Sequence, residues 1–240
     1  MSPVTVRAAT AADVPRIAAI HYAALNQYHE FYAAFFAAHP RDTLPVSIER
    51  AFHSRDTAFL VAEDAQTHEV FGFVRWKVLD PTAAVAPGVS GGGGSTVPSL
   101  FRMKDYLEEV WKRFAVKDDE MEACYEGAAG GEKHYYVQHL MIDPSHQRKG
   151  IGRTLLKAVL RKAQDDGLPT FLMSSAESFG LYKDMGFEDL GRWTVDNGFW
   201  MREVAAREAE LGITGAEGLA ARYEGVEEVE NVMMKRPELP

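Results

Sequence analysis

The stretch HYYVQHLMIDPSHQRKGIGRTLLKAVLRKAQDDG, residues 134–167, decides the fold of this chain. Its first nine residues are β-prone and end at Asp143-Pro144, which predicts a strand followed by a turn. From Gly150 to Gly167, apolar residues recur at helical spacing, which predicts an amphipathic helix. The inner face of that helix consists of Leu155, Leu156, Val159 and Leu160. The stretch therefore predicts a strand, a short glycine-containing turn and a helix.

The turn before this helix has the composition of an anion-binding site. Gly150 and Gly152 carry no Cβ, so a ligand can approach their backbone closely. The unpaired amides and the positive dipole end of a helix suit an anion such as pyrophosphate, and Arg148 and Lys149 add positive charge. The turn matches neither the Walker pattern, which ends in Gly-Lys-Ser/Thr, nor the Rossmann pattern, which needs a third glycine. From the glycines alone, a tightly packed turn without a ligand stays an open alternative.

Two motifs in this part of the chain resemble those of one known family. Gln147-Arg148-Lys149-Gly150-Ile151-Gly152 resembles the Gln/Arg-x-x-Gly-x-Gly/Ala signature of the GNAT acetyltransferase superfamily. Residues 170–175 resemble the fifth strand of that family, and 181-LYKDMGF-187 resembles its Leu-Tyr-x-x-x-Gly-Phe motif. The resemblance covers residues 134–195 closely, the N-terminal part by the order of elements, and residues 81–133 not at all.

The resemblance implies acetyl-CoA as co-substrate and no metal. In this family the sheet is splayed between strands 4 and 5, and acetyl-CoA inserts there and pairs with the backbone of strand 4. The cofactor-binding residues implied here are Leu140, Met141, Ile142, Gln147, Arg148, Lys149, Gly150, Ile151, Gly152, Ser175 and Ser178. Ser175 stands where the family often has an asparagine, and this departure weakens the implied contact.

The resemblance also implies a mechanism, in which a neutral primary amine attacks the thioester directly in a ternary complex. Tyr182 matches the tyrosine that gives a proton to the departing sulfur, and a tyrosine stays protonated near pH 7. Some family members carry a glutamate base on the fourth strand, where this chain has Tyr136. His139 is then the candidate base, because an imidazole titrates near neutral pH. Glu177 and a water-mediated route are the alternatives. A fourth-strand backbone amide is the expected oxyanion donor.

The rest of the chain predicts an α/β protein (α+β) with a mixed, mostly antiparallel sheet that is flanked by helices. We expect strands at 4–7, 58–62, 70–78, 134–142, 170–173, 187–195 and 229–235, and helices at 11–25, 28–36, around 48–52, 100–124, 150–166, 178–185 and 199–222. Residues 81–99 are rich in Pro, Gly, Ala and Ser and are predicted to be flexible. With the following helix and a loose joint at 127–131 they form an insertion, 81–133, before the fourth strand. It can serve as a lid, a packing element or a dimer contact. We expect residues 1–240 to form one domain.

The acceptor pocket of this family is built from the first helices and from the segment that joins the last two strands. The aromatic stripe at residues 28–36 then lies near the acyl group, although ordinary core packing gives the same spacing. The predicted substrate-binding residues are His29, Tyr32 and Trp193. An aromatic insertion favours a small-molecule amine as substrate. The alternatives are a protein or peptide N-acetyltransferase and a non-catalytic module that binds acyl-CoA.

Composition excludes several other classes of protein. The chain has 240 residues and a formal net charge of −9, which disfavours a nucleic-acid partner and favours a cationic substrate. No apolar run reaches the roughly 18–20 residues that span a bilayer, so we expect no membrane partner. The single cysteine, Cys124, cannot form an internal disulfide, which favours a cytoplasmic location. A homodimer stays open.

Overall fold

The computed structural model describes residues 3–81, 100–213 and 217–238. Its strands are β1 (Val4–Ala8), β2 (Thr57–Asp64), β3 (Val70–Leu79), β4 (His134–Ile142), β5 (Thr170–Ser175), β6 (Glu188–Asp196) and β7 (Glu227–Lys235). Its helices are α1 (Val14–Ala24), α2 (Asn26–Ala33), α3 (Pro40–Phe52), α4 (Glu108–Ala129), α5 (Ile151–Asp165), α6 (Ala176–Asp184), α7 (Asn197–Glu210) and α8 (Glu217–Arg222). Short 3-10 turns lie at Ala11–Asp13, Asp105–Leu107 and Pro144–His146.

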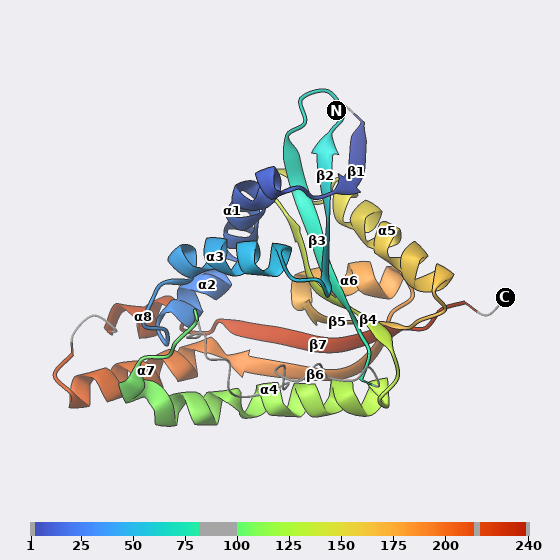
Figure 1. The fold of residues 1–240 in the computed structure, drawn as a ribbon. Coiled ribbons are helices and arrows are strands. Elements are labelled where there is room, and N and C mark those ends of the chain that lie inside the picture. The colour runs from blue at the N-terminus through green and yellow to red at the C-terminus, as the bar shows by residue number, and fades with distance from the viewer. Residues whose placement is uncertain (1–2, 82–99, 214–216, 239–240) are drawn as a thin grey trace.

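The seven strands form one open sheet in the order β1-β2-β3-β4-β5-β7-β6. Every neighbouring pair is antiparallel except β4 and β5, which run parallel. The predicted mixed, mostly antiparallel sheet is thus confirmed. Figure 1 shows β1 to β3 rising out of the body of the molecule, with helices packed on both sides of the sheet.

The sheet splits where β4 leaves β5. The two strands pair only from Tyr135 opposite Thr170 to Val137 opposite Leu172. Beyond Val137, β4 continues to Ile142 along β3 alone, so the edge of β4 that faces β5 is free of strand partners there. Gln138 is an extra residue on β4, because Trp76 of β3 pairs with Val137 and Arg75 pairs with His139. Such a bulge bends its strand, which helps the two halves of the sheet to diverge. The predicted splay between the fourth and fifth strands is confirmed.

Four apolar clusters hold the helices on the sheet, and the smallest of them packs Ala129 of α4 against Phe171 and Met234. α5 and α6 cover one face of the sheet with side chains such as Leu155, Leu156 and Tyr182. α1 and α3 cover the β2–β3 half of the other face through Ile17, Ile20 and Ile48. The third cluster is rich in aromatic residues and joins α2, α4 and α7; its fully buried aromatic members are Phe31, Phe35, Phe114 and Tyr223.

The insertion differs from its predicted form. The predicted flexible segment, residues 81–99, lies outside the described residues apart from residue 81. The helix that follows begins at Glu108, later than predicted, and continues through Gly127 to Ala129, where Gly130 with a φ of 58° ends it. A loose joint at 127–131 was therefore wrong, because the first of its glycines is helical. α4 lies along β6 and β7 (Figure 1), which matches the packing alternative for this segment.

No helix within the described ranges is long and apolar enough to cross a bilayer.

Candidate active site

The turn between β4 and α5 presents unpaired backbone amides. Gly150 adopts a φ of 81° and precedes the first residue of α5, Ile151. The backbone N–H of Thr154 donates to the Gly150 carbonyl at 3.1 Å, so the amides before Thr154 belong to the first turn and have no carbonyl partner within the helix. A Cβ at Gly150 would meet no atom within 4 Å. The glycine is needed for its left-handed backbone, and the space beside it is open to a ligand.

Side chains around the turn hold it in place. The Gln147 Nε2 donates to the carbonyl of Ile142 at 3.2 Å, which ties the turn to the end of β4. Asp143 accepts from the backbone N–H of Ser145 at 2.9 Å and pairs with Arg16 at 2.7 Å. These contacts, with the Ser145 hydroxyl foremost and Arg16 after it, lower the pKa of Asp143 to about 2 against the opposing effect of burial. These contacts tie the turn to the end of β4 and to α1.

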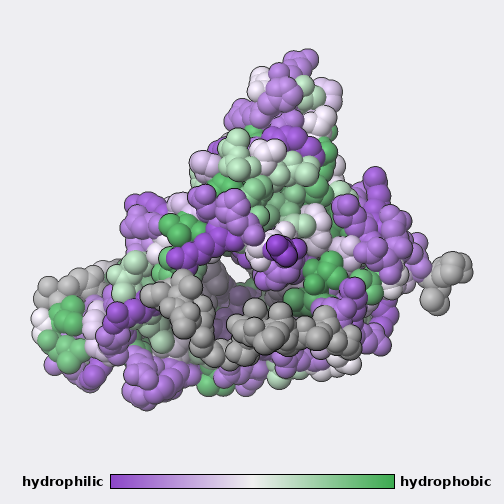
Figure 2. All heavy atoms as spheres, viewed as in Figure 1, coloured by the Kyte–Doolittle hydropathy of each residue, from purple (hydrophilic) through white to green (hydrophobic). Residues whose placement is uncertain are grey.

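A cavity of about 1060 Å³ occupies the split between β4 and β5. Figure 2 shows the molecule hollowed at its centre. All but one of the predicted cofactor residues line the cavity, namely Leu140, Met141, Ile142, Gln147, Arg148, Gly150, Ile151, Gly152, Ser175 and Ser178. The exception is Lys149, whose Nζ donates to the carbonyl of Ser145 at 2.8 Å. The structure therefore brings the two sequence motifs together around one cavity.

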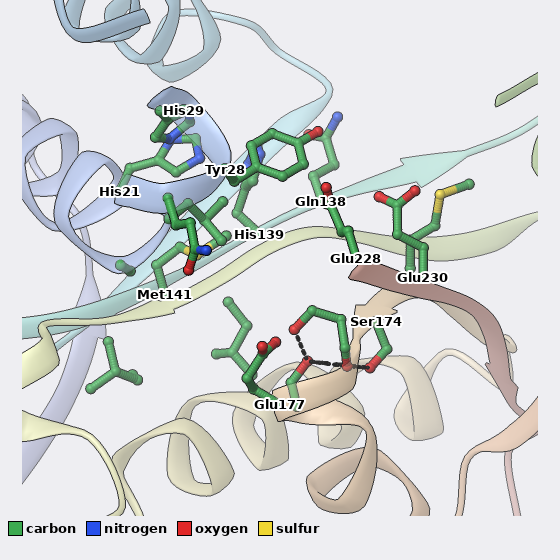
Figure 3. Close-up of a pocket in the computed structure, with 18 of the residues that line it drawn as sticks. His21, Tyr28, His29, Gln138, His139, Met141, Ser174, Glu177, Glu228 and Glu230 are labelled. Carbon is green, nitrogen blue, oxygen red and sulfur yellow. Dashed lines mark hydrogen bonds between the residues drawn. The ribbon is translucent and has the colours of Figure 1, made fainter. Parts of the chain in front are cut away.

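Tyr182 lies at the inner wall of this cavity. Its side chain is 5% exposed and packs edge-on against Phe187, the last residue of the second motif. Burial raises the pKa of Tyr182 to about 12, although a hydrogen bond with Ser178 opposes that shift. The phenol is accordingly protonated at every physiological pH. The hydroxyls of Ser174, Ser175 and Ser178 form a small network beside it, with oxygen–oxygen distances of 3.2 Å (Figure 3).

His139 sits in a group of imidazoles that disfavours protonation. Its ring centre lies 4.4 Å from that of His21, and the ring centres of His21 and His29 are 5.3 Å apart. Burial, followed by the charge of Arg75 and the proximity of His29, lowers the pKa of His139 to about 3. The imidazole is neutral at pH 7 but is a very weak base. The reason for predicting His139 as the base, an imidazole that titrates near neutral pH, does not hold at this position.

Glu228 of β7 has the titration behaviour that His139 lacks. It lines the cavity, and burial together with the charge of Glu230 raises the pKa of its carboxyl to about 7. Sequence reasoning missed this residue, because it expected the last strand to begin only at Val229. The two glutamates alternate with other residues in β7, but alternation alone is as typical of a solvent-facing strand edge.

The three predicted substrate-binding residues lie in different surroundings. His29 and Tyr32 line the cavity. Trp193 does not; its indole N–H donates to Glu120 of α4 at 3.0 Å, so it fastens β6 to that helix. A substrate role for Trp193 gains no support from this arrangement. Trp111 and Asp118 of α4 line the cavity and were not predicted to do so.

Comparison with known proteins agrees with these features. A family model described as acetyltransferase (GNAT) domain matches residues 102–205. The match includes α4. This helix was predicted to lie in an insertion that the family does not share, and the match shows that this prediction was wrong. Human N-acetyltransferase 8 is 29% identical over 102 residues, which make up 37% of this chain and 44% of that protein. The chain therefore spans less than half the length of this relative.

Solved structures of low sequence identity share the whole fold. A structure from Corynebacterium glutamicum, described as histone acetyltransferase HPA2 and related acetyltransferase, has a TM-score of 0.55 at 17% identity and covers 100% of this chain and 99% of its own. Mosquito arylalkylamine N-acetyltransferase like 5b has a TM-score of 0.54 at 17% identity and covers 98% of this chain and 100% of its own. The family model, the two motifs and the split sheet agree, and residues 102–205 are therefore identified as a GNAT acetyltransferase domain, a family that implies acetyl-CoA as co-substrate.

Proposed function

We propose that this protein transfers an acetyl group from acetyl-CoA to a primary amine of a small molecule, by direct transfer in a ternary complex. The observation that carries this proposal is the cavity between β4 and β5, with the first turn of α5 at its rim.

The residues at this rim fit a CoA-type ligand. The first-turn amides of α5 and the side chain of Arg148 suit a diphosphate, and the open backbone at Gly150 leaves room for it. The free edge of β4 beyond Val137 offers main-chain groups to an extended amide-containing arm. When bound, acetyl-CoA supplies an acetyl group that is activated as a thioester.

Direct transfer is supported by what the cavity contains. It is lined on one side by the rim of α5 and on another by β7 and α2, so donor and acceptor can occupy it together. The only thiol of the chain, Cys124, is not a lining residue, and its Sγ lies 3.7 Å from the carbonyl of Leu190. An acetyl-cysteine intermediate would need a thiol at the reaction centre. The chain's single cysteine does not meet that need.

Protein groups then have separate tasks in the reaction. Tyr182 holds the proton that the departing sulfur requires, because its phenol stays protonated. A β4 amide near Leu140 or Met141 stabilises the negative charge that develops on the acetyl oxygen. Both groups belong to regular elements packed in the core, which fixes their positions before any ligand binds.

A small molecule is favoured as acceptor because aromatic side chains wall the cavity. Tyr28, Tyr32 and Phe36 enter from the α2 side and Trp111 from α4. The rings of Tyr32 and Trp111 are in contact, with 6.3 Å between their centres, so aromatic side chains of α2 and α4 form one continuous wall there. Such a wall suits an amine with an apolar group more than an extended peptide.

The test measures thiol release from acetyl-CoA with a panel of small amines and a panel of peptides with free N-termini or lysines. Mass spectrometry with labelled acetyl-CoA identifies the product. We expect turnover with small amines and little with peptides. The reverse preference would favour a peptide acetyltransferase. Binding of acetyl-CoA without thiol release across both panels would favour a non-catalytic acyl-CoA-binding module.

A further inference from the structure

β7 brings two carboxylates to the open part of the split sheet. Glu228 and Glu230 are two residues apart, so both point to the same face of the strand. β5 ends at Ser175, opposite Glu230, and from there toward Glu227 the strand pairs with β6 only. Both carboxylates therefore line the cavity at the point where β5 no longer covers β7. Figure 3 shows them beside Tyr28 and Gln138, on the side of the cavity away from His21 and His29.

The two carboxylates differ in their partners. Glu230 pairs with Lys117 of α4 at 2.6 Å, and the two side chains are only 19% and 13% exposed. Its negative charge is thus compensated. Across the described ranges of the chain, no basic side chain forms an ion pair with Glu228. Glu228 is left as the carboxylate that can accept a proton or bind a cation.

Asn197 forms a side-chain hydrogen bond with Glu228, and two other side-chain oxygens at this position have no donor. Asn197, which lines the cavity and is 4% exposed, has an Oδ1 with no hydrogen-bond partner. The Oε1 of Gln138, the bulge residue of β4, is buried and unpaired as well. A buried acceptor without a donor costs about 1–3 kcal/mol. These oxygens, with the Glu228 carboxylate, suit a ligand that brings several N–H donors, as an ammonium group does.

The charge of the cavity is divided between its elements. Arg148 and Arg153 line it beside α5, where a phosphate-rich ligand is expected, and Arg75 of β3 and Glu177 of α6 are the charged lining residues outside these groups. The acidic lining residues of α4 and β7 are Asp118, Glu227, Glu228 and Glu230. A cavity with this division attracts an anion to one part and a cation to the other.

We propose that the β7 side of the cavity binds a cationic primary amine and that Glu228 accepts the proton this amine loses before it attacks the acetyl group. The inference rests on the proposed acetyl transfer and names both the charge of the acceptor and the base. The titratable groups that face Glu228 are Tyr28 and Tyr32 of α2, Lys117 of α4, Glu177 of α6, Tyr223 and Glu230.

The step balances with one proton released. The ammonium group gives a proton to a Glu228 carboxylate oxygen, which returns it to solvent. The neutral nitrogen forms the N–C bond as the C–S bond breaks. The sulfur takes the proton of Tyr182, and the second proton that leaves the nitrogen restores the phenol. The products are the amide and the free thiol.

The test compares two acceptors in the full-length protein with acetyl-CoA as donor. Phenethylamine is a cation at pH 7 and must lose a proton, whereas 2,2,2-trifluoroethylamine is already mostly neutral. We expect the wild-type kcat/KM for phenethylamine to rise with pH through about 7, the pKa of Glu228. Glu228→Gln should lower it about 100-fold or more and remove this rise, while the rate with trifluoroethylamine changes only a few-fold. Glu188→Gln, at an exposed β6 position outside the cavity, is the matched control and should behave as wild type.

The outcomes separate this inference from the proposed function. If wild type releases no thiol with any amine, the acetyl transfer itself fails. If wild type is active and Glu228→Gln keeps both its rate with phenethylamine and its pH dependence, Glu228 is not the base. A loss that is equal for both acceptors also overturns the inference, because it indicates damage to the site. Unchanged acetyl-CoA affinity, measured by calorimetry, shows that the variant is folded.

Discussion

The burial of Tyr182 serves both the packing of the core and the proposed chemistry. The ring is buried against Phe187 in the core that α6 shares with the sheet, and the same burial keeps the hydroxyl protonated by raising its pKa to about 12. A phenylalanine at this position keeps the ring contacts and removes only the hydroxyl group, with its proton and its hydrogen bond to Ser178. Position 182 therefore allows the catalytic role to be tested separately from the structural one.

Tyr182→Phe should lower kcat by about 10–1000-fold, the usual range for loss of a general acid. Acetyl-CoA affinity should change little, because the hydroxyl is proposed to act on the departing sulfur. Steady-state kinetics and calorimetry measure the two quantities. A variant with the kcat of wild type would remove Tyr182 from the chemistry. A variant that loses acetyl-CoA affinity instead would assign the hydroxyl to binding.

Glu228 should also make the free energy of unfolding depend on pH. Its pKa is raised from 4.5 to about 7 in the folded protein. Between these pH values the folded state keeps a proton that the unfolded chain has lost. The free energy of unfolding therefore falls as the pH rises through this window and is lowest above it. At 1.36 kcal/mol per pKa unit, the difference between 4.5 and about 7 corresponds to a loss of about 3 kcal/mol at most.

Glu228→Gln should accordingly stabilise the protein at pH 8 relative to its effect at pH 5, by about 1–3 kcal/mol. Denaturant unfolding of both proteins at the two pH values measures this difference. Equal effects at pH 5 and pH 8 would show that the carboxyl has an ordinary pKa. Together with a lower rate, a more stable variant would be the trade-off expected at an active site.

At the scale of elements, the start of α5 offers a matched pair of glycines. Gly150 has a left-handed backbone and open space around it, whereas a Cβ at Gly152 would meet Ile142 and Leu181 at 3.7 Å, an ordinary contact. Gly150→Glu should abolish acetyl-CoA binding, because it adds bulk and negative charge where a diphosphate is proposed. Gly152→Ala should fold and lose much less affinity, because its Cβ lies against protein side chains and adds no charge. Calorimetry with acetyl-CoA measures both, and unchanged affinity in Gly150→Glu would refute the anion site.

The β4–turn–α5 unit could be predicted from sequence to within a residue, because its signals are local. The β-prone run, the proline and the glycines stand in order, and the predicted strand 134–142 is β4 itself. The ends of α4 could not be predicted in this way. Several glycines follow each other near its end, and composition does not tell that Gly127 is helical while Gly130 adopts the left-handed conformation that stops the helix.

The base could not be predicted because its environment is made by distant segments. The pKa of Glu228, about 7, depends on burial and on the charge of Glu230. Glu230 in turn pairs with Lys117, which lies 113 residues earlier in the chain. The pKa of His139 could not be predicted from sequence for the same reason. Its type suggested proton transfer, but Arg75 and the neighbouring imidazoles, which come from three other elements, make it a very weak base.

At the scale of the whole molecule, the net charge of −9 and the acidic part of the cavity act in the same direction on a cationic acceptor. A negative field raises the local concentration of a cation, and the carboxylates of β7 are the groups proposed to bind it. This attraction is screened by salt, since the Debye length falls from about 10 Å at 0.1 M to about 3 Å at 1 M. An acceptor without charge experiences neither effect.

Raising the salt concentration from about 0.05 M to about 0.5 M should therefore increase the KM for phenethylamine several-fold and leave the KM for 2,2,2-trifluoroethylamine nearly unchanged. Acetyl-CoA must be saturating throughout, because its own phosphates respond to salt. The measurement separates two sources of specificity. If the KM values of the two amines respond alike, the acceptor is selected by the aromatic wall of α2 and α4 and not by charge. If only the cation responds, and Glu228→Gln reduces that response, the Glu228 carboxylate selects the acceptor.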